Sequence, residues 1–279
     1  MISLYVEVHR TRSEMSMLID HVPSDEKALE NGSSAPSSLT VFGFPAAGGS
    51  AAHFTRWRRW LPAGVTVEPV ELPGHGTRRQ EPAIDEWPRL VATTCDMLRD
   101  RVSGPYALAG HSFGALLAYE VAATLPRTGP GPALLIAAGR NGPAAGLAHR
   151  PLHALDDDRL IESLRRLGGT PADVLAEPAL MRLALPVLRT DLRLAETYAR
   201  PPRPALTCPI ATVVGRHDRM ADAAGALAWQ QETVDRFDLT VVDGGHFILD
   251  HPQVIAAVTA RTTELLRPAS RSGAGTTSG

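Results

Sequence analysis

A serine within the pattern GxSxG is the most chemically suggestive residue of this sequence. The segment Gly110-His111-Ser112-Phe113-Gly114 follows a short apolar run and precedes a pattern typical of an amphipathic helix. In a strand–turn–helix setting, such a serine lies on a tight turn that presents its hydroxyl outward, and small flanking residues permit that turn. The pattern therefore predicts a nucleophile at Ser112; the alternative is a glycine-rich connection with an incidental serine.

A serine hydroxyl is a weak nucleophile until a base takes its proton, so a histidine should lie nearby in the fold. His246 is the candidate base because it follows the last strand-like segment in DGGHFILDHP, where Gly244 and Gly245 favour a loop. The other histidines lie in polar surroundings, beside earlier motifs or in the turn that opens the final helical pattern. We therefore expect His246 to accept the proton of Ser112.

An acid that orients the base should also come late in the chain. Asp218 follows the strand-like segment PIATVVG directly, whereas the segment after the preceding strand reads GRNGP and has no carboxylate. The alternatives are Asp243, which reads more naturally as a turn residue at the end of a strand, and Asp222, which reads as a helix cap. We expect Asp218 to hold His246 and to stabilise its charged form.

Acyl chemistry at a serine also requires two N–H groups that stabilise the developing oxyanion. The residue after the nucleophile, Phe113, supplies the first N–H at the start of a helix, whose positive end favours the same charge. The glycine-rich segment FPAAGGSA after the first strand-like run supplies the second, and Ala47 is the expected donor. A simple glycine-rich turn is the alternative for this segment.

Short apolar runs alternate with amphipathic segments from residue 39 onward, which is typical of parallel strands joined by crossover helices. This rhythm predicts an α/β fold with a mostly parallel sheet and helices on both of its faces. The expected strands are 39–44, 65–72, 105–110, 132–139, 209–215 and 237–243, and the expected helices are 84–102, 113–125, 222–234 and 252–266.

Residues 150–205 break this rhythm with two successive helical patterns and no strand between them. In the strand numbering usual for such sheets, this insertion falls between the sixth and seventh strands. It should then lie over the carboxyl ends of the strands, where ligands bind. We interpret it as a helical lid; a packing subdomain without contact to substrate is the alternative. Pro186 is expected to kink or interrupt the second helix.

The two ends of the chain lack hydrophobic periodicity. Residues 24–38 are polar and rich in turn formers, and residues 269–279 form a Gly/Ser/Thr tail. We therefore expect a flexible N-terminal extension at 1–38, one folded domain at 39–267 and a disordered tail at 268–279. The sequence assigns no role to the extension.

Composition excludes several classes of protein. The 279 residues carry 28 basic and 30 acidic side chains, a formal net charge of −2, which gives no basic excess for nucleic acid. No segment approaches the roughly 18 apolar residues of a membrane span. The two cysteines, Cys95 and Cys208, have no ligand or disulfide spacing, and the N-terminus does not resemble a secretory signal. These features favour a cytoplasmic protein without a metal site.

The ordered set of motifs resembles the type II thioesterases, free-standing α/β-hydrolases that serve polyketide synthases and non-ribosomal peptide synthetases. The resemblance covers roughly residues 39–267 and depends on FPAAGGSA, LPGHGTRRQEP, AGHSFGALLAYE, LRRLGGTP, LPVLRTDLRLAETY and GGHFIL. It implies a serine hydrolase that cleaves acyl groups from the phosphopantetheine arm of an acyl or peptidyl carrier protein without a cofactor. It also implies a triad of Ser112, Asp218 and His246, with Ala47 and Phe113 as oxyanion donors.

Three positions depart from the pattern of this family. Ala46 stands where many members have histidine, His75 where arginine is usual, and Arg219 where proline is common. None is a triad position, so we expect them to affect loop geometry and substrate or carrier preference. An acyltransferase or carboxylesterase with the same triad, or a non-catalytic interaction protein, remains as an alternative.

The helical insertion should also contribute to recognition. Its apolar positions are expected to line part of an acyl channel, with the remainder packing on the core; they are Leu160, Leu164, Leu167, Leu180, Leu183 and Val187. Four arginines on its helices are candidates for steering an acidic carrier protein, with solvated helix faces as the alternative. They are Arg165, Arg166, Arg189 and Arg193.

Overall fold

A computed structural model describes residues 38–126 and 130–267. The proposed N-terminal extension, apart from Ser38, and the proposed C-terminal tail at 268–279 therefore lie outside the described residues. Within the described part, no helix is both long and apolar enough to cross a membrane.

Six parallel strands form one sheet in the order β2-β1-β3-β4-β5-β6. The predicted strands are all found, with slightly different bounds: β1 Leu39–Phe44, β2 Val65–Pro69, β3 Tyr106–His111, β4 Leu134–Ala138, β5 Ile210–Gly215 and β6 Phe237–Val242. The predicted α/β architecture with a parallel sheet is confirmed. Central strands such as β3 are buried along their whole length, as expected where helices cover both faces.

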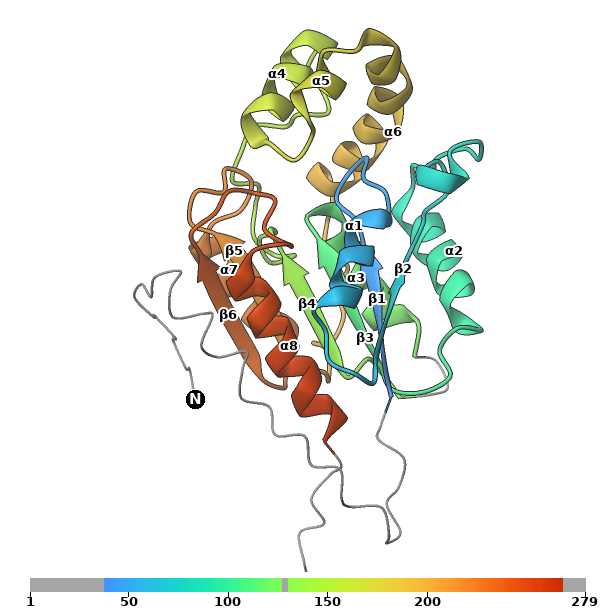
Figure 1. Cartoon of the computed structure of the whole chain (residues 1–279), viewed down its shortest axis with the longest axis vertical. Coiled ribbons are helices and arrows are strands. Elements are labelled where there is room, and N and C mark those ends of the chain that lie inside the picture. Colours follow the sequence, from blue (N-terminus) through green and yellow to red (C-terminus); the bar gives the residue numbers. More distant parts are fainter. Residues whose placement is uncertain (1–37, 127–129, 268–279) are drawn as a thin grey trace, which may run out of the picture.

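Helices cover both faces of the sheet (Figure 1). On one face lie α2 (Trp87–Arg99) and α3 (Phe113–Thr124), and on the other lie α1 (Ala52–Thr55) and α8 (Pro252–Leu266). The helix expected at 222–234 is α7 (Ala223–Leu227) followed by the 3-10 turn η3 (Ala228–Glu232); η1 (Arg56–Arg59) and η2 (Gly76–Arg78) are further short turns.

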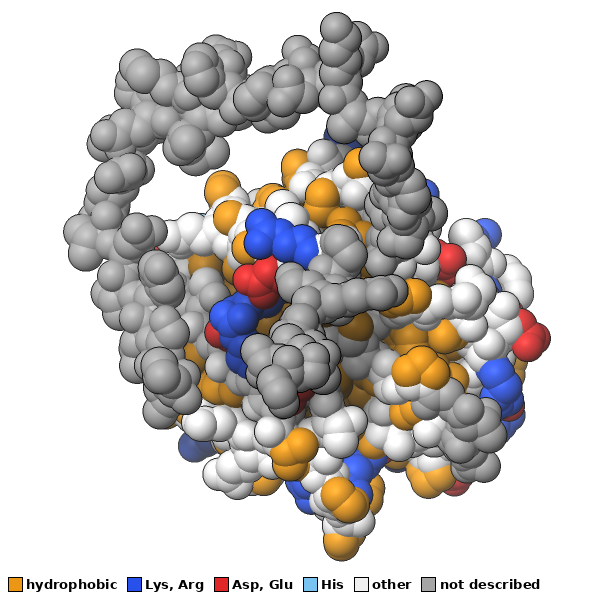
Figure 2. Space-filling model, turned by 90° about the horizontal axis from the view of Figure 1, so that it is seen from below, with side chains coloured by type: hydrophobic (Ala, Val, Ile, Leu, Met, Phe, Trp, Pro, Cys, Tyr) orange, Lys and Arg blue, Asp and Glu red, His pale blue; other side chains and the backbone are white. Residues whose placement is uncertain are grey.

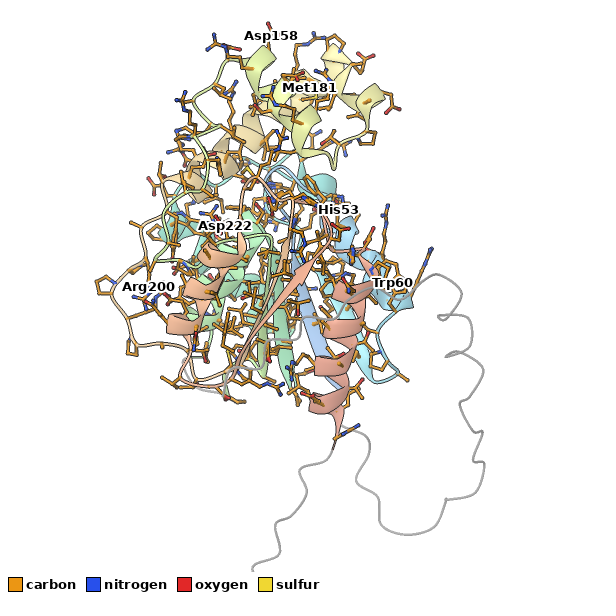
Figure 3. The ribbon with its side chains drawn as sticks, turned by 90° about the vertical axis from the view of Figure 1, so that its left-hand side faces the viewer. His53, Trp60, Asp158, Met181, Arg200 and Asp222 are labelled. Atoms are coloured by element: carbon orange, nitrogen blue, oxygen red, sulfur yellow. The ribbon has the colours of Figure 1, made fainter. Side chains whose placement is uncertain are left out.

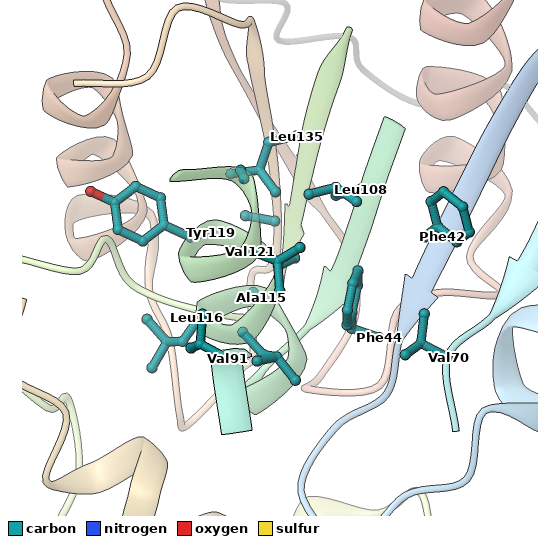
Figure 4. Packing of buried hydrophobic residues seen from close by; sticks show 14 of the residues in the cluster. Phe42, Phe44, Val70, Val91, Leu108, Ala115, Leu116, Tyr119, Val121 and Leu135 are labelled. Atoms are coloured by element: carbon teal, nitrogen blue, oxygen red, sulfur yellow. The ribbon is translucent and has the colours of Figure 1, made fainter. Parts of the chain in front are cut away.

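Alternating strand residues divide the core between the two faces. Phe42 and Leu108 pack with the side chains of α3, whereas Val41 and Ala107 pack on the α8 side. Figure 4 shows the α3 side, where strand side chains meet Ala115 and other residues of the helix. The helix is buried from Phe113 to Ala122, so its position relative to the sheet is fixed by contacts all round.

The helical insertion, residues 150–205, contains α4 (Asp157–Leu167), α5 (Ala172–Leu175) and α6 (Pro178–Glu196). It lies between the fourth and fifth strands, not the sixth and seventh, because this sheet has six strands in the described part of the chain. Pro186 was expected to kink or interrupt its helix; it does not interrupt it, because α6 is continuous. A proline within a helix costs about 3 kcal/mol. Burial of Met181, Leu185 and Leu188 offsets that cost.

The insertion lies beyond the carboxyl ends of the strands, at the top of Figure 1. In Figure 3, Asp158 lies at its outer end and Met181 lies among its helices, whereas Asp222 and His53 lie near the sheet end. The opposite end of the molecule shows hydrophobic, basic and acidic side chains mixed together on its visible described surface (Figure 2). Because the insertion lies beyond the carboxyl ends of the strands, the loops that follow the strands meet beneath it.

Candidate active site

Ser112 occupies a strained turn between β3 and α3. Its backbone angles are φ 55° and ψ −114°, and it is the sole non-glycine residue with positive φ in the described ranges. The turn leaves no room for side chains at its flanks: a Cβ on Gly110 would lie 2.1 Å from the Gly114 carbonyl oxygen, and one on Gly114 would lie 2.2 Å from that of Phe44. Such strain is maintained where a side chain must be presented for function.

His246 and Asp218 form a buried pair in the loops after β6 and β5. The His246 Nδ1 atom lies 2.9 Å from Asp218 Oδ2 and 3.1 Å from Oδ1. The side chains are 5% and 0% exposed. Asp218 Oδ1 also accepts the Met220 N–H at 2.7 Å, which fixes the carboxylate. An ionised carboxylate only accepts, so the Nδ1–H donates to Asp218 and Nε2 is left as the basic nitrogen.

The two rival aspartates have other partners. Asp222 caps the N-terminus of α7 by accepting the Gly225 N–H at 2.6 Å. Asp243 lies 2.9 Å from His217 Nε2 in a pair whose side chains are 73% and 67% exposed. Neither carboxylate contacts His246, so of the three aspartates that the sequence offered, Asp218 alone has the geometry to orient it.

Ser112 and His246 both lie beside the carboxyl end of β4. The Ser112 N–H donates to Ala138 O at 2.8 Å, and a Cβ on the next residue, Gly139, would lie 3.4 Å from His246 Cε1. Ser112 is 7% exposed, and no hydrogen bond joins its hydroxyl to His246 in the described part of the chain. Hydrogen bonds between nucleophile and base are often long before substrate binds. This geometry is therefore compatible with His246 acting as the base once substrate is present.

His111 is a second histidine at the site to which the sequence assigned no role. Its Nε2–H donates to the His246 carbonyl oxygen at 2.8 Å, and the two ring centroids lie 4.9 Å apart. Burial, together with the nearby charge of His246, lowers the pKa of His111 to about 3. His111 is therefore neutral at physiological pH and holds the backbone of the His246 loop to the strand that carries Ser112.

The two expected oxyanion donors lie at neighbouring strand ends. Phe44 pairs with Gly110 in the sheet, which places the segment after β1 beside the Ser112 turn. Phe113 is the first residue of α3, so its N–H has no acceptor within the helix. Ala47 packs against the apolar cluster of the insertion. These positions suit the roles expected of Phe113 and Ala47, which remain predictions.

A buried ion pair beside this site was missed by sequence reasoning. Asp191 of α6 accepts hydrogen bonds from Gly48, next to Ala47, and from His75 after β2. The signal was present, because Asp191 interrupts an apolar helix face formed by Leu185, Leu188 and Leu192. In the described residues, this pair included, no group of three or more histidine, cysteine and acidic side chains is arranged to hold a metal ion.

The recognition residues expected on the insertion are only partly arranged as predicted. Leu160 is fully buried in the insertion's own core, whereas Leu180 and Leu183 are exposed. The four arginines all face acidic residues of this chain: Arg165 and Arg166 pair with Glu162, Arg189 with Asp157, and Arg193 with Asp85. Their charge is therefore partly balanced within the chain.

The insertion also packs on Phe247, the residue after His246. The Phe247 ring lies against Gly169, where a Cβ would lie 2.3 Å from it. The same ring lies 5.2 Å from that of His246 and 5.4 Å from that of His111. The connection between α4 and α5 thus packs over the histidines of the site.

Comparison with known proteins shows the family of the chain. The thioesterase domain family matches residues 39–262. The chain belongs to this family. Over 225 residues the thioesterase is 37% identical to the probable cadicidin biosynthesis thioesterase of Streptomyces griseus, covering 81% of this chain and 62% of that protein. It is 31% identical to the gramicidin S biosynthesis protein GrsT of Aneurinibacillus migulanus, covering 76% of this chain and 84% of that protein.

The thioesterase also resembles solved structures. The type II thioesterase BorB from the borrelidin biosynthetic cluster is 35% identical, with a TM-score of 0.74, and the match covers 84% of this chain and 94% of BorB. The resemblance to type II thioesterases and the α/β-hydrolase fold expected from the sequence are confirmed by these similarities.

Proposed function

We propose that this protein hydrolyses acyl thioesters through an acyl-Ser112 intermediate, with His246 as the base and Asp218 as its orienting acid. The observation that carries the proposal is the strained Ser112 turn at the same sheet end as the buried His246–Asp218 pair. Membership of the thioesterase family supports the reaction class.

Acylation begins when Ser112 Oγ attacks the thioester carbonyl carbon and His246 Nε2 takes the hydroxyl proton. The carbonyl oxygen gains negative charge, which the N–H groups of Ala47 and Phe113 stabilise. The C–S bond then breaks, and the departing sulfur receives the proton from His246. The products of this step are an ester at Ser112, a free thiol and a neutral His246, so atoms and charges balance.

Deacylation repeats the same steps with water as the nucleophile. His246 takes a proton from water, the hydroxide attacks the ester carbonyl, and Ser112 leaves as its hydroxyl with the proton returned. Asp218 holds the Nδ1–H throughout and stabilises the imidazolium that forms twice in each cycle. The helical insertion acts as a lid in this proposal, because its packing against Phe247 and Ala47 covers the reacting groups.

We propose as substrate an acyl or peptidyl group on the phosphopantetheine arm of a carrier protein in the cytoplasm. Relatives named for gramicidin S and cadicidin biosynthesis, together with the similarity to a type II thioesterase, support this class. No organic cofactor or metal takes part in the steps above.

The test compares the rates at which the acyl group is released from acyl-carrier protein, acyl-CoA and an oxygen ester of the same acyl group. Fastest turnover of the acyl-carrier protein, abolished by Ser112→Ala, supports the proposal. Fastest turnover of the ester would favour a carboxylesterase, and acyl transfer to an added alcohol in preference to water would favour an acyltransferase.

A further inference from the structure

A buried carboxylate of the helical insertion reaches the segment that carries one proposed oxyanion donor. Asp191 Oδ2 accepts the Gly48 N–H at 2.8 Å. The same oxygen lies 2.8 Å from His75 Nε2, and the side chains of both residues are 3% exposed. Three segments far apart in the sequence thus meet at one oxygen atom: the loop after β1, the loop after β2 and helix α6.

The hydrogen bonds define the charge of His75. Its Nε2 faces the carboxylate of Asp191 and its Nδ1 lies 3.0 Å from the Pro73 carbonyl oxygen. Both partners are acceptors, so only the doubly protonated imidazolium donates to both. Burial would lower the pKa of His75, but the hydrogen bond and charge of Asp191, with a smaller contribution from Glu71, raise it. The two acceptors therefore favour the protonated form of His75 and an ion pair with Asp191.

Further contacts make α6 the support of this loop. Leu188, one helical turn before Asp191, packs so closely on Gly48 that a Cβ there would lie 3.0 Å from the leucine Cβ. Gly48 has φ +65°, so the loop has a conformation suited to glycine. Glu71 holds the far end of the loop by accepting the Ala51 N–H at 3.0 Å. Ala47 lies directly before these attachments, between the end of β1 at Phe44 and the Gly48 N–H that Asp191 accepts.

We propose that the His75–Asp191 pair positions the loop after β1 so that the Ala47 N–H points at the oxyanion. Because Asp191 belongs to α6, this position depends on the helical insertion being packed against the loop. Neither residue touches substrate; both act through the Gly48 N–H. The inference rests on the proposed role of Ala47 in acyl transfer. When the insertion moves away, the Asp191–Gly48 hydrogen bond breaks and the oxyanion site loses its geometry. Full activity therefore requires the insertion to be packed against the loop after β1.

The chain provides a matched control on the same helix. Glu196 of α6 is 1% exposed, lies 2.6 Å from His153 Nδ1 and accepts the Leu152 N–H at 2.8 Å. It is therefore another buried carboxylate–histidine pair that also accepts a backbone N–H, but its partners lie at the start of the insertion and not in the loop after β1. Glu196→Gln and His153→Gln should perturb folding comparably without moving Ala47.

The experiment measures kcat and KM of the full chain on an acyl-N-acetylcysteamine thioester, with unfolding by urea as a measure of stability. We expect Asp191→Asn to lower kcat at least tenfold with KM changed less than threefold, because an oxyanion exists only in the transition state. Glu196→Gln should leave kcat within about twofold. Equal kcat values for the two folded variants would overturn the proposal.

A pH profile separates positioning from a merely structural role. The kcat of the unaltered protein should fall at alkaline pH as His75 loses its proton, and this fall should be absent in His75→Gln and present in His153→Gln. An alkaline fall that persists unchanged in His75→Gln would overturn the proposal, and this variant decides the matter if Asp191→Asn does not fold. If none of these variants, including Ser112→Ala, lost thiol release, the proposed function itself would be refuted.

Discussion

Two histidines lie at the site around Ser112 and differ in charge: His111 stays neutral, whereas His246 is proposed to become charged. His111 precedes the nucleophile and is held neutral by burial, with its pKa lowered to about 3. His246 is held by Asp218, and in the proposed mechanism its Nε2 takes the serine proton. A positive charge on His111 would lie beside the imidazolium that His246 becomes during turnover. The neutral state of His111 therefore favours the charged state of His246.

The depressed pKa of His111 predicts a pH dependence of stability. Below pH 6.5 the unfolded chain takes up a proton at this residue while the folded chain does not, so stability falls as pH falls. The slope from this residue approaches about 1.4 kcal/mol per pH unit towards pH 5. His75 acts in the opposite sense near pH 6.5, because its raised pKa favours the protonated folded chain, but this contribution disappears towards pH 5, where the residue is protonated in both states.

Urea unfolding at several pH values between 6.5 and 5 checks this expectation. His111→Gln keeps a donor for the His246 carbonyl oxygen but cannot be protonated, so its free energy of unfolding should fall less steeply with acidity. Identical slopes for the two proteins would show that His111 is not buried in its neutral form.

The choice among the three aspartates gives a second prediction at this scale. Asp218→Asn should lower kcat by about 10³-fold or more, because the amide favours the wrong tautomer of His246. Asp222→Asn and Asp243→Asn should keep kcat within about threefold, since these side chains serve a helix cap and a surface pair. Steady-state kinetics of the three variants decides between them, and a larger loss at Asp243 would contradict the assignment.

At the scale of elements, the strand–turn–helix unit from β3 to α3 was the most predictable part of the chain. Its glycine spacing and apolar runs are local signals, and the nucleophile follows from them. Helix α6 was less predictable, because Pro186 argued for a break that tertiary burial of Met181 and Leu185 overcomes. Local propensity does not include the contacts that a distant core supplies.

The tight packing of this unit predicts a large cost for one methyl group. Gly110→Ala should lower the free energy of unfolding by about 2 kcal/mol or more, since its Cβ would lie 2.1 Å from the Gly114 oxygen. Gly104→Ala is the matched control, because a Cβ there has no atom within 4 Å. Urea unfolding of both variants measures the difference, and equal stabilities would contradict the described turn.

For the whole molecule, the parallel sheet explains why residues spread over the sequence form one site. Strand ends gather the segments after β1, β3, β5 and β6, so the order of strand-like runs was enough to predict that Asp218 and His246 lie at the same sheet end as Ser112. The His75–Asp191 contact could not be predicted in this way. Its residues are 116 positions apart, and α6 reaches the loop only through the path of the insertion.

The proposed carrier-protein substrate predicts a dependence on salt. Turnover of acyl-carrier protein should fall with ionic strength more steeply than turnover of an acyl-N-acetylcysteamine thioester, because only the former brings a charged surface. The ion pairs of Arg165, Arg189 and Arg193 within this chain should make the difference modest, about threefold between 50 and 300 mM salt. Parallel rates for the two substrates would remove the electrostatic part of carrier recognition.

The central claim is that Ser112 is the nucleophile, and intact-mass analysis after treatment with a serine-directed fluorophosphonate tests it most directly. The unaltered protein should gain the mass of one adduct, located by proteolysis to the peptide that contains Ser112. Ser112→Ala, which keeps the surrounding fold, should gain none and should lose thioester turnover by several orders of magnitude. An adduct of the same mass that persists in Ser112→Ala would contradict the account.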